Sequence, residues 1–277
     1  MCMCINNHVL IFPFIIIGFL TCLLFGCNPS DQTQQQNREL QRDVLRLRMG
    51  QALNPTDAEG YIQLGIAYRE LGEYENAMES FQNAIALDDR HHHAYNNLGL
   101  VYADLGLFIL AIETFHTALE LSPGNPAFYN NLGYAYDMTD QFDEALAAFQ
   151  NAIETEPTFA DAYYNMASTY LHREMYQDAI QNYEAALEIE EGDADTYFNL
   201  GLAYEENGEF LRAIQSYEKG LSLDDSDVEA YYRLAQAYQK NDDPLMMRRY
   251  LEIFLERAKD IPYLQEQIRT AEKMLDR

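Results

Sequence analysis

A period of 34 residues runs through most of the chain and restricts its fold more than any other feature. Five kinds of side chain recur in register along it. The series are Gly65, Gly99, Gly133, Ala167, Gly201 and Ala235; Tyr61, Tyr95, Tyr129, Tyr163, Tyr197 and Tyr231; Tyr68, Tyr102, Tyr136, Tyr170, Tyr204 and Tyr238; Ala77, Ala111, Ala145, Ala179 and Ala213; Phe81, Phe115, Phe149, Tyr183 and Tyr217. Such a period predicts similar structural units stacked in one direction.

Each period reads as a pair of helices, as residues 92–125 illustrate. Tyr95, Leu98 and Tyr102 lie on one face at the spacing of an amphipathic helix. Gly106 follows the last turn of this helix, where a left-handed residue favours glycine. A second helix then carries Ile109, Ile112, Phe115, Ala118 and Leu119, and Pro123 ends it. Small residues at Gly99 and Ala111 predict that the two helices cross closely.

This pattern resembles the tetratricopeptide repeat over about three quarters of the chain. The resemblance implies an all-α, right-handed superhelical solenoid of antiparallel helix pairs. Its six units are residues 58–91, 92–125, 126–159, 160–193, 194–227 and 228–261. Residues 37–53 are expected to form an orphan helix that closes the first end, and 262–277 a C-terminal capping helix. In the sixth unit Phe254 replaces an alanine, which predicts looser packing or a different neighbour.

The first 27 residues hold all four cysteines of the chain and an apolar segment from Val9 to Phe25. The sequence at the end of this segment, Leu24-Phe25-Gly26-Cys27, resembles a bacterial lipobox. The resemblance implies that residues 1–26 are a signal peptide and that Cys27 receives the lipid. Residues 27–57 would then be a polar tether plus the N-terminal helix, on a lipoprotein of the outer membrane that faces the periplasm. Asn28 favours that membrane by resemblance to a bacterial sorting rule, and an inner-membrane location is the alternative.

A second interpretation of the N-terminus is an uncleaved membrane anchor. The residues before the apolar segment contain no Lys or Arg, whereas four arginines between residues 38 and 48 follow it. By the positive-inside rule this arrangement would leave the body of the protein in the cytoplasm.

The net charge of −27 comes from the middle of the chain. Residues 58–227 contain 32 Asp and Glu but only 5 Lys and Arg. Such a field repels nucleic acids and favours protein or peptide partners that are basic or neutral. We find no signature of a catalytic site or a cofactor, and we expect the triplet His91–His93 to be a solvated turn rather than a metal site. The chain is therefore expected not to be an enzyme.

The candidate binding site is a row of amide side chains. By resemblance to the family, the position two residues after the first tyrosine of each unit lines a concave groove. Asn97, Asn131, Asn165 and Asn199 occupy it, and a carboxamide can pair with both polar groups of a peptide backbone. Tyr164 and Phe198 are expected to add apolar contacts. The acidic lining is expected to comprise Glu59, Asp161, Asp195, Glu206 and Glu229.

Together these patterns predict a membrane-anchored scaffold that binds an extended peptide or a partner protein. The layout resembles lipoproteins of pilus and secretin biogenesis and repeat lipoproteins that dock cell-wall enzymes. The alternative is a regulator or adaptor that faces the cytoplasm. The sequence leaves the oligomeric state open; such arrays often pair through their ends, and the sixth unit is the favoured place for such a contact.

Overall fold

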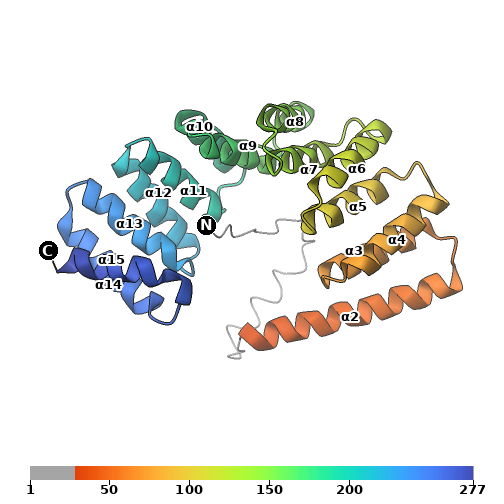
Figure 1. Cartoon of the computed structure of the whole chain (residues 1–277), viewed down its shortest axis with the longest axis horizontal. Coiled ribbons are helices and arrows are strands. Elements are labelled where there is room, and N and C mark those ends of the chain that lie inside the picture. The colour runs from red at the N-terminus through yellow and green to blue at the C-terminus, as the bar shows by residue number, and fades with distance from the viewer. Residues whose placement is uncertain (1–28, 277) are drawn as a thin grey trace. The chain divides into compact units, whose positions relative to one another are not determined.

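The computed structural model describes residues 29–276, which contain fourteen α-helices and one short 3-10 helix but no strand (Figure 1). The chain divides into two compact units, residues 1–89 and residues 90–277. Each unit is described by itself below. The predicted signal peptide and Cys27 lie outside the described residues.

The first unit contains α2 (Pro29–Leu53), α3 (Ala58–Glu70) and α4 (Tyr74–Leu87). Helix α2 begins eight residues before the orphan helix expected at residue 37, so the polar stretch interpreted as a flexible tether is helical from Pro29. Val44 and Gln51 of α2 are buried, and α2 packs against α3. The Nε2 of Gln51 donates to the carbonyl of Asp57 at 3.1 Å, which ties α2 to the residue that caps α3.

The second unit contains five helix pairs and a terminal helix. Its elements are α5 (His92–Asp104), α6 (Phe108–Leu121), α7 (Pro126–Asp137), α8 (Phe142–Thr155), α9 (Ala160–His172), α10 (Tyr176–Ile189), α11 (Ala194–Glu206), α12 (Phe210–Leu223), α13 (Val228–Lys240), α14 (Pro244–Ala258), η1 (Pro262–Leu264) and α15 (Gln265–Leu275). With α3 and α4, these are the six predicted pairs.

The ends of the helices follow from local chemistry. Asn125, Asp193 and Asp227 accept hydrogen bonds from backbone N–H groups in the first turns of α7, α11 and α13. Gly106 has a φ of +72°, as expected for the residue that follows the first helix of a pair. Asp140 takes the same left-handed conformation, with φ of 60°, in the next unit, although it carries a side chain.

The close crossing predicted within each pair is confirmed. A Cβ atom on Gly133 would lie 2.6 Å from the Cε1 atom of Phe149, and one on Gly99 would lie at the same distance from Phe115. Both rings are fully buried. The glycines therefore provide the space in which the aromatic ring of the second helix lies.

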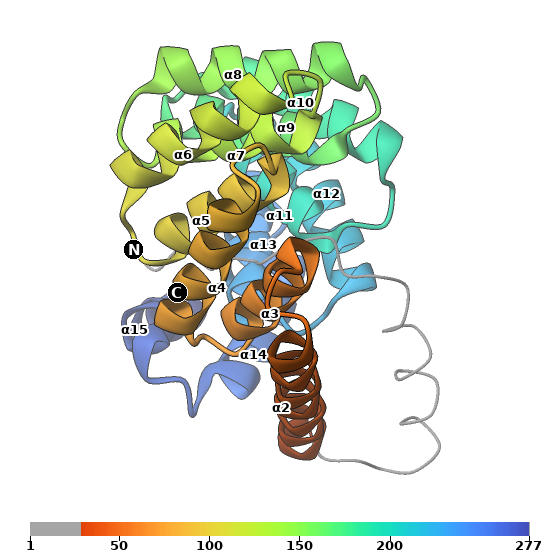
Figure 2. The same cartoon turned by 90° about the vertical axis from the view of Figure 1, so that its right-hand side faces the viewer.

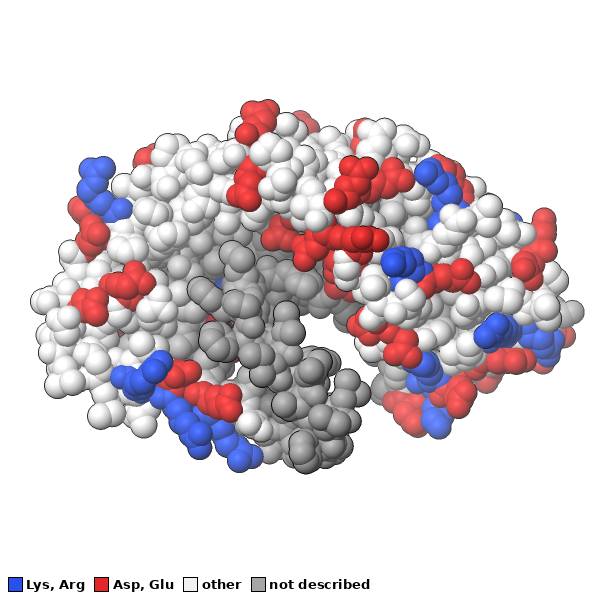
Figure 3. All heavy atoms as spheres, turned by 180° about the vertical axis from the view of Figure 1, so that it is seen from behind, with Lys and Arg blue, Asp and Glu red and all other residues white. Residues whose placement is uncertain are grey.

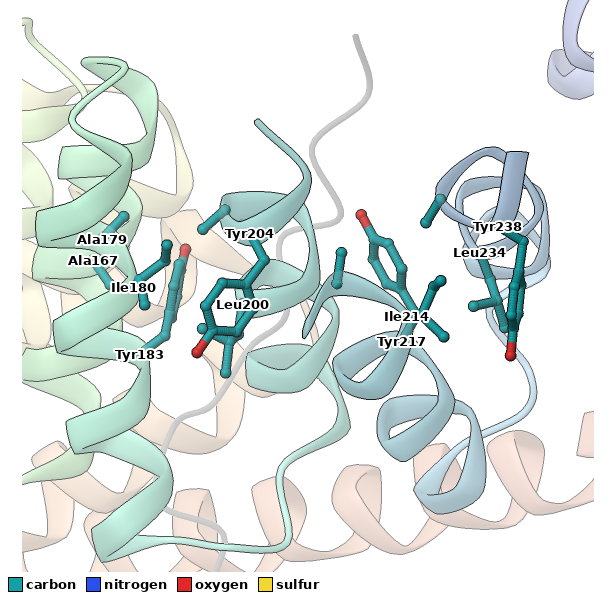
Figure 4. Packing of buried hydrophobic residues seen from close by; sticks show 13 residues of the cluster. Ala167, Ala179, Ile180, Tyr183, Leu200, Tyr204, Ile214, Tyr217, Leu234 and Tyr238 are labelled. Carbon is teal, nitrogen blue, oxygen red and sulfur yellow. The ribbon is translucent and has the colours of Figure 1, made fainter. Parts of the chain in front are cut away.

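Successive pairs of the second unit share one apolar core. Figure 4 shows this core from α9 to α13, where Tyr183, Leu200, Tyr217 and Leu234 lie between neighbouring helices. Each second helix packs on the first helix of the next pair. Figure 2 shows the same stack from the side. This arrangement is the all-α solenoid of antiparallel helix pairs that the period predicts.

The C-terminal end differs from the repeat pattern, and Phe254 does have a different neighbour. Its ring is fully buried, with its centroid 5.0 Å from that of Tyr232, in a cluster with Leu264 and Ala271. Helix α15 therefore covers the last pair as the predicted cap. The predicted cap begins at residue 262, but Tyr263 lies in the 3-10 turn before α15 and is 72% exposed.

Candidate partner-binding surface

The inner side of the second unit is formed by the first helices of its pairs. Helix α7 contacts both α5 and α9, and α9 contacts α11, in addition to the contacts between successive helices. Direct contacts between alternate helices arise where a curved stack is narrowest. All six predicted site residues lie on these helices: Asn97 on α5, Asn131 on α7, Tyr164 and Asn165 on α9, and Phe198 and Asn199 on α11.

Three of the four asparagines form an internal ladder between neighbouring first helices. The Nδ2 of Asn131 donates to the Oδ1 of Asn96 at 2.9 Å, and the Nδ2 of Asn165 donates to the Oδ1 of Asn130 at 2.9 Å. The Nδ2 of Asn199 donates to the Oη of Tyr164, also at 2.9 Å. One N–H of each amide is thus already used within the protein. The side-chain carbonyl oxygens of these three asparagines accept no hydrogen bond from any residue that the structure describes.

Asn97, at the start of the row, is bonded differently. Its Nδ2 donates to the backbone carbonyl of His93 in the same helix at 2.8 Å. At the other end, Arg233 occupies the equivalent position and lies 3.4 Å from Glu229. The residue before Asn199 is Phe198, which offers no acceptor for an amide or a guanidinium group. Each amide of the ladder donates to the residue that precedes the equivalent amide one unit earlier, so the ladder ends where that residue has no oxygen acceptor, as at Phe198 opposite Arg233.

The two aromatic residues of the predicted site are half-buried and packed within the protein. Burial raises the pKa of Tyr164 to about 12, with a further contribution from Asp195 and Asp193. Its ring lies edge-on to that of Tyr183, with centroids 5.7 Å apart.

Phe198 lies over Gly220, where a Cβ atom would be 2.5 Å from its Cε1 atom. The sequence contained a signal for this contact, because Gly220 replaces the alanine found at that position in the four preceding units.

The predicted acidic lining is only partly exposed. Glu206 and Asp161 are exposed, Asp195 is half-buried, and Glu229 is paired with Arg233. Glu59 belongs to the first unit, where it accepts from Gln63 at 2.9 Å. Figure 3 shows one face of the molecule, on which acidic side chains dominate the middle repeats.

Two further carboxylates near the C-terminal ends of first helices had no periodic signal in the sequence. Burial raises the pKa of Asp137, and the Oδ1 atom of this residue is buried without a hydrogen-bond partner. His172 lies 3.9 Å from the other oxygen of Asp137. Burial also raises the pKa of Glu205, which accepts a hydrogen bond from the Oη of Tyr217 at 2.9 Å. Both are half-buried acidic groups on the first helices that carry the row of amides.

A second set of side-chain bonds joins α10 to α11 and α12 to α13. Tyr238 donates to Glu218 at 2.6 Å, and Tyr204 donates to Glu184 in the equivalent place one unit earlier. The tyrosines are those of the 34-residue series, so one of the repeated residues serves both packing and hydrogen bonding.

In the part of the chain that the structure describes, we find neither a metal site nor a helix that could span a membrane. The rings of His92 and His93 lie 4.4 Å apart and contact Phe128, and no group of three potential ligands is arranged to hold a metal ion among residues 29–276. Within the same residues, none of the helices combines the length and apolarity needed to cross a bilayer.

Comparison with sequence families identifies the repeat. A profile described as "Tetratricopeptide repeat" matches residues 91–155 and 158–226, and one described as "TPR repeat" matches residues 65–106 and 139–172. Together they match the chain without a gap from residue 65 to residue 226, which is more than half of its length. No curated protein matches the sequence significantly.

Solved structures show the same fold. The Cut9–Hcn1 hetero-tetramer of the APC/C contains a chain that matches with a TM-score of 0.69 and 19% identity, over 85% of this protein and 46% of that chain. This protein therefore spans less than half of the Cut9–Hcn1 chain. The Pseudomonas aeruginosa PilF structure matches with a TM-score of 0.66 and 19% identity, over 76% and 95% of the two chains.

A structure of MamA matches with a TM-score of 0.53 and 29% identity, over 60% of this protein and 97% of that chain. The tetratricopeptide repeat is typically a non-catalytic scaffold for protein interactions. The chain carries tetratricopeptide repeats in the predicted register and belongs to the tetratricopeptide repeat proteins.

Proposed function

We propose that the protein is a membrane-anchored scaffold that holds an extended peptide or a segment of a partner protein along the inner side of its first helices. The observation that carries this proposal is the row of amides at Asn131, Asn165 and Asn199. Each uses one N–H for the internal ladder, and its carbonyl oxygen accepts no hydrogen bond from the described residues.

The internal bonds make these amides better suited to binding an extended chain. A side chain that is already fixed by one hydrogen bond loses less conformational entropy when a ligand arrives. Its carbonyl oxygen can accept from a peptide N–H, and its second N–H can donate to a peptide carbonyl. Each amide of the row lies on a separate first helix, so the distance between neighbouring amides is set by the packing of these helices. Such a site recognises the backbone of the partner more than its sequence.

The charge of the surroundings selects the partner further. Asp161, Asp195 and Glu206 lie on the same first helices as the amides, and residues 91–172 contain no Lys or Arg at all. We infer that the bound segment is basic or neutral. A nucleic acid is disfavoured because its phosphates would be repelled.

The proposed location is the bacterial cell envelope. The lipobox-like sequence that ends at Cys27 supports a lipid anchor in the outer membrane, and the six repeats suit a role in pilus or secretin biogenesis or in docking of cell-wall enzymes. The intact mass of the protein extracted from membranes tests the anchor. A chain that begins at Cys27 with added acyl mass is expected. A chain that begins at Met1 would favour the alternative, an adaptor that faces the cytoplasm.

The ladder allows a matched test of the binding site. One variant replaces Asn97, Asn131, Asn165 and Asn199 by alanine. The control combines Asn96→Ala, Asn130→Ala and Tyr164→Phe, which removes the acceptors of the same internal hydrogen bonds but keeps the row of amides. Proteins that co-purify with a C-terminally tagged chain are quantified by mass spectrometry for both variants and the wild type.

The expected result is loss of the captured partner in the ladder variant and only a partial decrease in the control, whose amides remain but are no longer fixed by an internal hydrogen bond. Far-ultraviolet circular dichroism must show equal helicity in both proteins. Equal capture by both variants, or equal loss, would contradict a binding role for the amides themselves.

A further inference from the structure

Helix α2 departs from the repeat pattern on the face that points away from α3. Leu45 is 59% exposed and Met49 is 63% exposed, four residues apart on that face. One period later, the position of Leu45 carries Glu79, and in the following units it carries Glu113, Ala147, Gln181 and Gln215. The position of Met49 carries Asn, Thr, Asn, Ala and Lys in the same five units. We call Arg42, Leu45, Met49 and Leu53 the outer stripe of α2.

A second departure of the same kind occurs at the turn between α5 and α6. Leu107, Ile109 and Leu110 are 45%, 60% and 42% exposed, and we call them the turn patch. The position of Leu107 carries Glu or Gln or Asp in four of the other five units, and that of Leu110 carries Asn, Glu, Asp or Arg in four of five. Adjacent exposed apolar residues at positions that are polar in most of the other units indicate a contact surface.

The charges around these two surfaces are complementary. Four arginines lie within eleven residues of α2, from Arg38 to Arg48, and Arg42 belongs to the outer stripe itself. The turn patch lies in residues 91–172, which contain ten Asp and Glu and no Lys or Arg. Glu113 is exposed one helical turn beyond Ile109. An apolar patch beside a carboxylate suits an apolar helix face that also carries arginine.

We propose that the outer stripe of α2 in one copy of this chain docks on the turn patch of a second copy. The contact pairs Leu45 and Met49 with Ile109 and Leu110, and it brings the arginines of α2 against the acidic surroundings of the patch. Two different surfaces meet in this contact, so copies join either reciprocally as a two-fold pair or head-to-tail in a ring or an open row. Chains held on one membrane would be concentrated enough to favour it. The proposal is independent of the partner-binding row of amides.

Site-specific photo-crosslinking of the full-length chain in membranes tests this contact. A benzophenone amino acid replaces Ile109 in a copy with one tag, and a copy with a second tag is expressed beside it. The expected product has twice the mass of the chain and carries both tags. The peptide of the second copy attached at the crosslink, identified by mass spectrometry, should come from α2.

Variants of the second copy then test the outer stripe. Leu45→Gln combined with Met49→Gln is expected to lower the yield of the double-tagged product about tenfold or more, because two apolar side chains lose their buried contacts. Leu245→Gln, at an exposed leucine outside both surfaces, is the matched control and should leave the yield unchanged. Arg42→Glu should lower the yield, and Glu113→Arg in the first copy should restore it.

The other outcomes overturn the proposal. A crosslink to α2 within a single chain would place the contact inside one copy. A crosslink to lipid or to a different protein would identify another occupant of the turn patch. A double-tagged product whose yield is unaffected by Leu45→Gln with Met49→Gln would show that the copies meet elsewhere.

Discussion

Replacement of Gly133 by leucine should destabilise the second unit strongly, because this glycine provides the space for a buried ring. The ring of Phe149 is 1% exposed, and a Cβ atom on Gly133 would lie 2.6 Å from it. Overpacking of this kind costs ~1–3 kcal/mol. Displacement of the ring toward solvent loses a further ~2–3 kcal/mol of apolar burial. Leucine regains ~1 kcal/mol because it is a better helix former than glycine.

The net effect on the free energy of unfolding is therefore a loss of about 2–5 kcal/mol, which corresponds to a fall in Tm of roughly 5–20 °C for a unit of this size. Gly50→Leu is the matched control. Gly50 lies inside α2, and nothing lies within 4 Å of the position of its Cβ atom. The same substitution there should raise stability slightly, by ~0.5–1 kcal/mol.

Thermal and urea unfolding followed by circular dichroism measure both variants. An unchanged midpoint for Gly133→Leu would refute the close crossing. An equal loss in both variants would show that the cost lies in leucine itself and not in the contact with Phe149.

Three further predictions concern the surroundings of the row of amides. Asp137→Asn should raise Tm at pH 7. Burial raises the pKa of the carboxyl group in the folded state above its unfolded value, so the ionised form destabilises the fold. The gain in Tm over the wild type should therefore shrink as the pH falls through that raised pKa. Tyr164→Phe should lower the free energy of unfolding by about 1 kcal/mol in urea titrations, because Asn199 loses its acceptor. Gly220→Ala should lower the free energy of unfolding more in the wild type than in a protein that already carries Phe198→Ala. The double-mutant cycle should give a coupling energy between the two positions of roughly 0.5–3 kcal/mol. Additive effects would contradict a contact between Gly220 and Phe198.

The repeated residues predicted the helix pairs because each has one dominant physical role. A glycine opposite an aromatic ring, or a glycine after the last turn of a helix, has few other uses in such a pattern, so the crossings and the turn at Gly106 were predictable. The same series also fixed where the pairs begin and end. The start of α2 was not predictable in this way, because the polar residues after Pro29 carry neither an apolar period nor a helix-breaking residue.

The candidate site was less predictable because a carboxamide has several uses. The 34-residue spacing of Asn131 and Asn165 locates them on the inner helices. It does not reveal that Asn96 and Asn130, each on the preceding first helix, accept one of their N–H groups. Phe198 was expected to face a ligand, and the sequence did not reveal that its half-buried ring also packs over the space left by Gly220. The binding role of these residues stays a prediction, which the matched variants test.

Contacts that join mainly neighbouring helices also determine how the second unit would respond to force. Among residues 90–276, each pair packs mainly on the pairs next to it. A pull on the two ends should therefore detach helix pairs one after another instead of rupturing the whole array at once. Each detached pair frees 34 residues, or about 110 Å of extended chain. A protein anchored at one end and loaded by a partner at the other would lengthen in small steps while its remaining pairs stayed folded.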